Sequence, residues 1–161
     1  MVIHKHSFEL QSDLSELKSL SHHLNNFSQA TGLSEEFVSR INICLDELFT
    51  NVVLYGFSDD LEQVVKFEMK IEGNVLKMTI EDKGIPFNPL EKECSELHKD
   101  LGKVKVGGLG IQIVKKLMDD ISYERKLGKN KLTLKKFIRT SSYIYQNDLV
   151  KKESFNYHAR N

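Results

Sequence analysis

Two neighbouring stretches of alternating apolar and charged residues constrain the fold most. Residues 65–71 place Val, Phe, Met and Ile at every second position, and residues 76–80 do the same with Leu, Met and Ile. Gly73 and Asn74 between them are typical turn residues. Because side chains alternate between the two faces of a strand, the pattern predicts an antiparallel hairpin with one buried face. Another layer of apolar side chains must cover that face.

Two amphipathic stretches before the hairpin can supply the covering layer. After Asp13, apolar residues recur at spacings of three and four until Gly32, which predicts a helix. A second predicted helix begins after Ser34, whose hydroxyl suits an N-cap, and ends near Gly56. Its expected buried stripe is Phe37, Ile41, Leu45, Leu48 and Val52. Residues 2–11 suit an additional strand.

The C-terminal half of the chain repeats both kinds of element. A glycine-rich turn, 107–110, opens a third amphipathic helix, and two strands, 121–127 and 131–138, flank a turn at 128–130. The sequence therefore predicts an α/β two-layer sandwich with helices on one face of a mixed, largely antiparallel sheet. We expect one domain over 1–138, followed by a tail, 139–161, of unknown role.

Composition narrows the class of partner. The 161 residues suit a single domain, and 23 basic side chains balance 23 acidic ones. This balance does not favour a nucleic-acid surface, so we expect a protein or small-molecule partner. No apolar run is long enough for a membrane span, and no signal sequence is evident. Cys44 and Cys94 have no paired metal or redox spacing, which favours the cytoplasm.

A carboxylate and a set of glycines suggest a nucleotide site. Asp82 is in phase with the apolar Ile80, and a carboxylate on the buried side of a strand is costly without a dedicated partner. An adenine amino group can be that partner. The glycines of 107–110 would let backbone N–H groups approach phosphates at a helix N-terminus. Residues 88–106 lack periodicity and predict a long loop between these two features.

Glu47 and Asn51 lie one turn apart on the second predicted helix, so their side chains are neighbours. An amide oxygen can join Mg²⁺ coordination beside phosphate oxygens, and a carboxylate one turn earlier can deprotonate a nucleophile. The alternative is that both are ordinary polar residues at the border of an apolar stripe, as in any amphipathic helix.

The order of the three motifs resembles a known superfamily. The segments 44–51, 82–89 and 107–123 are similar to the N, G1 and G2 boxes of the GHKL (histidine-kinase-like) ATPases. Within that superfamily the chain most resembles the bacterial anti-sigma factor serine kinases. The resemblance covers roughly 8–137, and it implies that ATP and Mg²⁺ are the cofactors.

The resemblance also implies roles for individual residues. Glu47 matches the general base, Asn51 the Mg²⁺ ligand, and Asp82 the carboxylate that recognises adenine. The segment 88–106 matches the lid over ATP. The residues that the resemblance places around the nucleotide are Asn51, Asp82, Gly84, Gly108, Leu109, Gly110 and Thr133.

In that family the γ-phosphoryl group of ATP is transferred to a serine or threonine of a small anti-anti-sigma protein, which competes with a sigma factor for the kinase. The resemblance is compatible with a homodimer. One departure is Val106, because kinases of the family often carry arginine there. A nucleotide-gated binding module that phosphorylates nothing therefore stays open as the alternative. A detached histidine-kinase domain is less favoured, since no helical hairpin offers a phosphoacceptor histidine.

Overall fold

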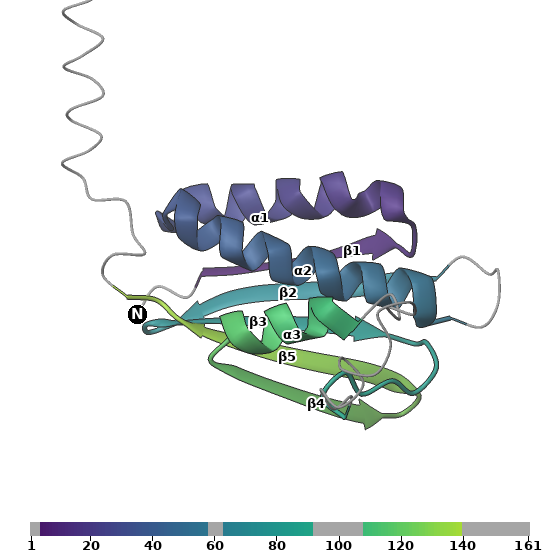
Figure 1. The fold of residues 1–161 in the computed structure, drawn as a ribbon. Helices are drawn as coiled ribbons and strands as arrows, with labels where there is room; N and C mark the ends of the chain where they lie inside the picture. Colours follow the sequence, from purple (N-terminus) through teal and green to yellow (C-terminus); the bar gives the residue numbers. More distant parts are fainter. Residues whose placement is uncertain (1–3, 58–62, 92–107, 140–161) are drawn as a thin grey trace, which may run out of the picture.

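The computed structural model describes residues 4–57, 63–91 and 108–139. These residues form five strands, three α-helices and one short 3-10 helix (Figure 1). In chain order the elements are β1 (His4–Gln11), η1 (Leu14–Glu16), α1 (Leu17–Thr31), α2 (Glu35–Tyr55), β2 (Val64–Glu72), β3 (Val75–Asp82), α3 (Gly108–Leu117), β4 (Asp120–Lys126) and β5 (Lys129–Phe137). The predicted lid, 88–106, and tail, 139–161, lie mostly outside the described residues.

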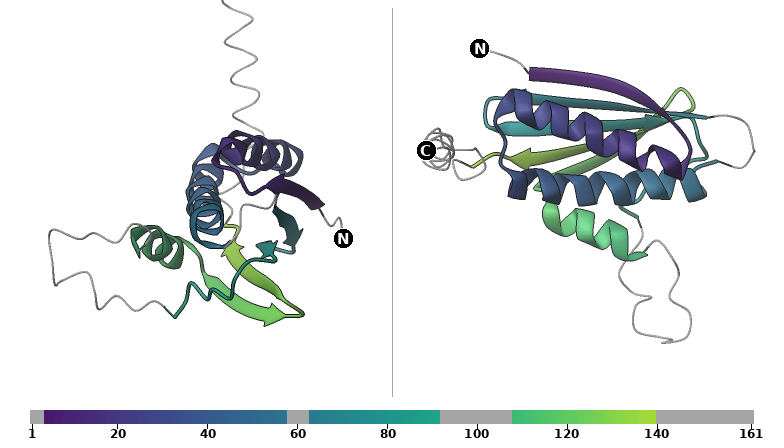
Figure 2. Two further views of the ribbon diagram at one scale, coloured as in Figure 1. Left: turned by 90° about the vertical axis from the view of Figure 1, so that its right-hand side faces the viewer. Right: turned by 90° about the horizontal axis from the view of Figure 1, so that it is seen from above.

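The strands form one sheet in the order β1-β2-β3-β5-β4. All four pairings are antiparallel, so the prediction of a largely antiparallel sheet is confirmed, and its mixed character is absent from the described strands. The helices lie on one face of the sheet, with α2 between α1 and α3 (Figure 2). The result is the α/β two-layer arrangement expected from the sequence.

Local sequence signals explain where the helices begin and end. The Ser34 hydroxyl accepts a hydrogen bond from the backbone N–H of Phe37 at 3.3 Å, which caps α2. Gly32 ends α1 with φ of +70°, a conformation that costs little without a side chain. The first turn after Asp13 differs from the prediction. It is the 3-10 helix η1, and α1 begins only at Leu17.

The core lies between the helices and the inner face of the sheet. The apolar alternation of β2 and β3 points inward as predicted, and Phe49 of α2 packs edge-on against Phe67 of β2. Cys44 is fully buried in this layer. Burial raises the pKa of its thiol to about 11, so the thiol stays protonated and unreactive near neutral pH.

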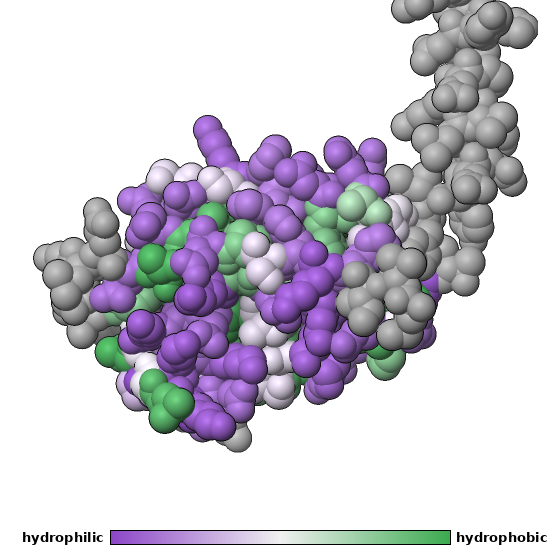
Figure 3. All heavy atoms as spheres, turned by 180° about the vertical axis from the view of Figure 1, so that it is seen from behind, coloured by the Kyte–Doolittle hydropathy of each residue, from purple (hydrophilic) through white to green (hydrophobic). Residues whose placement is uncertain are grey.

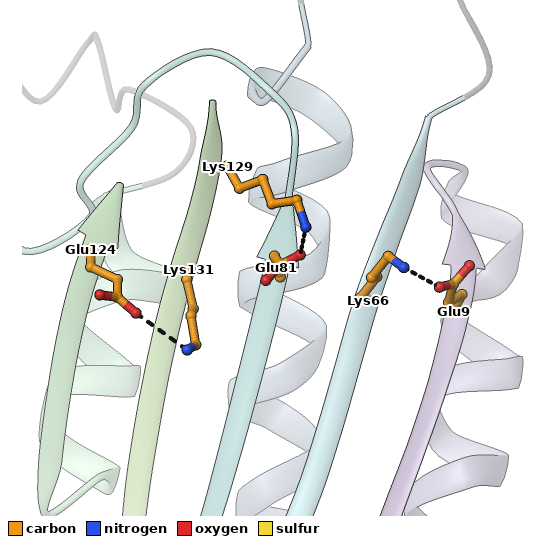
Figure 4. A network of polar contacts seen from close by, with 6 residues as sticks. All are labelled: Glu9, Lys66, Glu81, Glu124, Lys129 and Lys131. Atoms are coloured by element: carbon orange, nitrogen blue, oxygen red, sulfur yellow. Dashed lines mark hydrogen bonds and ion pairs between the residues drawn. The ribbon is translucent and has the colours of Figure 1, made fainter. Parts of the chain in front are cut away.

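The outer face of the sheet carries charge instead of a helical layer. One row crosses all five strands with alternating sign, and its members Glu9, Lys66, Glu81, Lys131 and Glu124 are consecutive register partners. Figure 4 shows this row together with the ion pair between Lys129 and Glu81, at 2.8 Å. The rear view in Figure 3 is mostly hydrophilic. In the described part of the chain, no helix is long and apolar enough to cross a membrane.

Candidate functional site

A cleft opens between the C-terminal half of α2 and the inner face of the sheet. It has about 470 Å³ of empty space, its open mouth included. Its walls are mostly apolar, with a few polar side chains at one end, which is the usual composition of a small-molecule site. The lining residues are Leu48, Asn51, Val52, Gly56, Ile80, Asp82, Phe87, Pro89, Ile111, Tyr123, Asn130 and Leu132.

Asp82 places a carboxylate at the polar end of the cleft. It is the last residue of β3, and the alternation that buries Ile80 also points Asp82 inward, where it is 6% exposed. Its Oδ1 atom accepts hydrogen bonds from the backbone N–H of Gly84 and from Nδ2 of Asn130, both at 2.8 Å. Burial raises the pKa of Asp82, and these two donors oppose the rise. Oδ2 has no hydrogen-bond partner among the described residues.

Asn130 connects Asp82 to the β4–β5 hairpin. Its Nδ2 donates to Asp82 and to the carbonyl oxygen of Ile85, at 2.8 and 2.9 Å. Its Oδ1 accepts from the Tyr123 hydroxyl and from Nη1 of Arg125, both at 2.7 Å. The buried amide therefore makes four hydrogen bonds, so its polar atoms are satisfied and its orientation is fixed.

Gly84 is required by the close approach of two backbone segments. The chain after β3 passes against the end of α2, where the backbone N–H of Ile85 donates to the carbonyl oxygen of Gly56 at 2.7 Å. A β-carbon on residue 84 would overlap that same carbonyl oxygen. The absence of a side chain lets the loop close this end of the cleft.

Glu47 lies beside the N-terminal turn of α3, one helical turn before Asn51. A β-carbon on Gly110 would overlap the Glu47 carboxylate, so the two residues are in direct contact. Glu47 is partly exposed and lies outside the residues that line the cleft. A carboxylate at the rim of a cleft, next to a helix N-terminus, can accept a proton from a group that approaches from outside.

Asn51 has an unsatisfied polar atom. The residue is 7% exposed, and its Nδ2 is buried without a hydrogen-bond partner among the described residues. Buried polar groups are normally paired, so an orphan in a cleft indicates a missing ligand. The amide fits a magnesium nucleotide, because its oxygen can coordinate the metal and its nitrogen can donate to a phosphate oxygen.

The phosphate-side residues of the prediction begin α3. Gly108 is its first residue, and Gly110 contacts Glu47 as described above. The Leu109 side chain is 65% exposed and does not line the cleft, so only its backbone could contact a bound phosphate. The free N–H groups of the first turn suit an anion.

Thr133 is not brought to the cleft, contrary to the prediction. It alternates along β5 with the buried Leu132 and Leu134, so it points to the outer face of the sheet. The predicted turn at 128–130 is displaced as well. The hairpin turns at Leu127 and Gly128, both with positive φ, and Lys129 already belongs to β5.

Asn130, Tyr123 and Arg125 are the residues that sequence reasoning missed. Placing Asn130 in a turn hid its strand phase, which points it inward beside Leu132. The signal was available. Leu132 and Leu134 fix the inner face of β5, and counting back by two reaches Asn130.

Comparison with known proteins agrees with this geometry. A family model described as the histidine kinase-like ATPase domain matches residues 10–136. The chain belongs to that family. Membership agrees with a cleft between α2 and the sheet that is lined by Asn51 and Asp82, and it confirms the fold and the superfamily that the three motifs predicted.

Curated relatives within the family are distant. The anti-sigma F factor of Geobacillus sp. (strain WCH70) is 26% identical over 108 residues, covering 66% of this chain and 74% of that protein. The anti-sigma F factor of Bacillus subtilis (strain 168) is 28% identical over 87 residues, or 54% and 60%. A serine/threonine-protein kinase, BtrW of Bordetella bronchiseptica, is 26% identical over 94 residues, or 58% and 66%.

A solved structure shares the fold. The chain superposes on the structure of the RsbU and RsbW domains of Rv1364c from Mycobacterium tuberculosis with a TM-score of 0.62 at 12% identity. The match covers 87% of this chain and 34% of that one. At this identity the likeness supports the family fold and no specific activity.

Proposed function

We propose that the protein is an ATP-dependent protein serine/threonine kinase that acts as an anti-sigma factor. It would phosphorylate an anti-anti-sigma protein in a partner-switching pathway. The observation that carries the proposal is the contact between the Glu47 carboxylate and Gly110, which puts a base beside the helix end suited to phosphate. The names of the curated relatives, anti-sigma F factors and a serine/threonine-protein kinase, support the same role.

The residues divide the chemistry among them. Asp82 lines the cleft, and its Oδ2 would accept a hydrogen bond from the adenine amino group. The first turn of α3 would donate to phosphate oxygens, and Asn51 would hold a Mg²⁺ ion that neutralises phosphate charge. Glu47 takes the proton of the acceptor hydroxyl. The hydroxyl oxygen then bonds to the γ-phosphorus of ATP while the bond from that phosphorus to the bridging oxygen breaks, which releases ADP. No covalent enzyme intermediate is needed, because positioning and charge neutralisation supply most of the rate.

Phosphotransfer to candidate acceptors tests the proposal. Incubation with Mg-ATP and the anti-anti-sigma-like proteins of the same genome should give acid-stable phosphoserine or phosphothreonine on one of them. Glu47→Ala should lower transfer by about 100-fold or more while ATP affinity changes little, because general bases contribute on this scale. Glu36→Gln is a matched control, since Glu36 is an exposed carboxylate on the same helix.

The results separate the two candidate functions. A Glu47→Ala protein that transfers phosphate at the original rate would remove Glu47 as the base. ATP binding by the wild type without transfer to any acceptor would favour the alternative, a nucleotide-gated regulator that captures its partner without modifying it. Acid-labile phosphohistidine on the product would instead point to a histidine kinase.

A further inference from the structure

We propose that Asn130, held in place by Tyr123 and Arg125, is a positioning residue that makes the cleft selective for 6-aminopurines over 6-oxopurines. The inference rests on the proposed nucleotide-binding function and adds three residues to which the sequence motifs assign no role. It follows from the arrangement of hydrogen bonds around Asp82 at the polar end of the cleft.

The first step is that the Asn130 amide has only one suitable orientation. Two donors, the Tyr123 hydroxyl and Arg125 Nη1, point at one end of the amide, and two acceptors, Asp82 Oδ1 and the Ile85 carbonyl, lie at the other. Turning the amide by 180° would place its oxygen against both acceptors and its nitrogen against both donors. The buried position makes that arrangement costly.

The second step is that this orientation decides which Asp82 oxygen faces a ligand. The Gly84 N–H and the Asn130 amide both donate to Oδ1, so that oxygen is occupied. Oδ2 is left as a hydrogen-bond acceptor, and Asp82 lines the cleft. An adenine amino group can donate to such an oxygen, whereas the O6 atom of guanine is an acceptor and would be repelled.

The third step concerns the charge of Asp82. Burial favours the protonated carboxyl, which could donate to a guanine O6 and so would weaken the discrimination. The Asn130 donor, the Gly84 N–H and the Arg125 guanidinium favour the ionised form, and Glu81 on the same strand opposes it. The Tyr123 hydroxyl bonds to Asn130 rather than to Asp82. Asn130 thus helps to keep Asp82 an acceptor.

Arg125 also joins the amide to the loop after β3. The same Nη1 atom donates to Asn130 Oδ1 and, at 3.0 Å, to the carbonyl oxygen of Gly84. The neighbouring N–H of Gly84 is one of the two donors to Asp82. The β4–β5 hairpin therefore fixes both groups that orient the carboxylate.

The test is titration of the full-length protein with Mg-ATP and Mg-GTP from pH 5 to 8. Asn130→Leu removes the amide at similar volume, and Tyr123→Phe removes only the hydroxyl. Ser122→Ala is the matched control, because Ser122 adjoins Tyr123 but points to the outer face of β4. Thermal unfolding of each variant checks that it is folded.

We expect Asn130→Leu to weaken ATP binding by about tenfold or more and to reduce the ATP-to-GTP affinity ratio by at least about fivefold. The pH below which ATP binding fails should rise, because Asp82 loses a donor. Tyr123→Phe should reduce the ATP-to-GTP affinity ratio by about two- to fivefold. It should also move the pH midpoint of ATP binding upward, by less than Asn130→Leu does. Ser122→Ala should match the wild type.

An unchanged ATP-to-GTP affinity ratio and an unchanged pH midpoint in both variants would overturn the inference. A fall in ATP affinity alone would not support it, because a purely structural role also lowers the affinity. If Asn130→Leu does not fold, Tyr123→Phe decides by the same two readouts. Failure of the proposed function has another signature. The wild type would then bind no ATP, or would bind it and transfer nothing, whatever the variants do.

Discussion

The carboxylate of Glu47 lies directly against the α-carbon of Gly110, so the proposed base on α2 touches the first turn of α3. A side chain at residue 110 would have to displace that carboxylate. It also ties the position of the base to the position of the helix end that would hold phosphate, so a change on either side should alter both.

Gly110→Ala should therefore impair transfer more than stability. The added methyl group must displace the Glu47 carboxylate, and misplacing a catalytic group by about 1 Å can cost on the order of 100-fold in rate. The overlapping atoms are the end of a flexible side chain that can move aside, so we expect the free energy of unfolding to change by less than about 1 kcal/mol. Urea unfolding and phosphotransfer assays measure the two effects.

Two further variants make this prediction specific. Lys116→Ala, at an exposed position on α3, should change neither quantity. In a Glu47→Ala protein, Gly110→Ala should lower the transfer rate no further, because the carboxylate that the methyl group would displace is already gone. Strictly additive losses of transfer rate in the double variant would show that the contact is not the cause.

Asp82→Asn should separate stability from binding. Burial raises the pKa of Asp82 in the folded protein. At a pH above that pKa, the ionised carboxyl is therefore less favourable in the folded state than in the unfolded chain, which lowers the stability. The neutral amide removes this penalty, so the variant should unfold at the same or a higher temperature at pH 7.5. Its amide nitrogen would face the adenine amino group, and we expect ATP affinity to fall about tenfold or more. Calorimetric titration measures the ATP affinity, and thermal unfolding measures the stability. The prediction is contradicted if the affinity and the unfolding temperature both fall, or if neither changes.

Gly84→Ala should destabilise the protein through its backbone. The methyl group would meet the Gly56 carbonyl oxygen, which accepts the Ile85 N–H bond and cannot rotate away. The free energy of unfolding should drop by about 1–3 kcal/mol, measured in urea. Lys83→Ala, at the exposed neighbouring position, should stay within about 0.5 kcal/mol of the wild type. Equal stability of the two variants would argue against the close approach.

His23 should make stability depend on pH between 5 and 7. It stacks on Phe8, and its Nδ1 lies 3.0 Å from Nε2 of His6. Burial and the neighbouring His6 lower the pKa of His23 in the folded protein, and Glu16 opposes the shift. The unfolded chain then binds more protons, so stability is fully present above the unfolded pKa of about 6.5 and is lost as the pH falls below it.

Unfolding in urea at pH 7.5, 6.5 and 5.5 measures this dependence. His23→Gln should flatten it, whereas Lys18→Gln, at an exposed position on the same helix, should retain the wild-type slope. A wild-type slope in His23→Gln would show that other groups cause the pH dependence.

Periodicity was sufficient to predict most of the fold and where Glu47, Asn51 and Asp82 lie on their own elements. The 3.6-residue repeat of α2 placed Glu47 and Asn51 one turn apart, and the alternation of β3 turned Asp82 inward. Both inferences depend only on position within one regular element. The distances between elements are not encoded locally, so the contact of Glu47 with Gly110 required the structure.

The β4–β5 hairpin shows where such reasoning fails. Thr133 was chosen for its residue type, although its apolar neighbours place it on the outer face. The turn was misplaced because Leu127 adopts a φ of 51°, which is unusual for a residue with a side chain. Moving a turn changes the phase of the strand after it, and this hid Asn130 from the prediction.

The alternating charges on the outer face of the sheet favour the native strand register over registers shifted by one residue. A slip of one residue in β5 would turn Lys129 and Lys131 toward the apolar layer and away from Glu81. The same slip would expel Asn130 from the cleft. Charged side chains on the face opposite the cleft thus destabilise register shifts that would turn the residues lining the cleft outward.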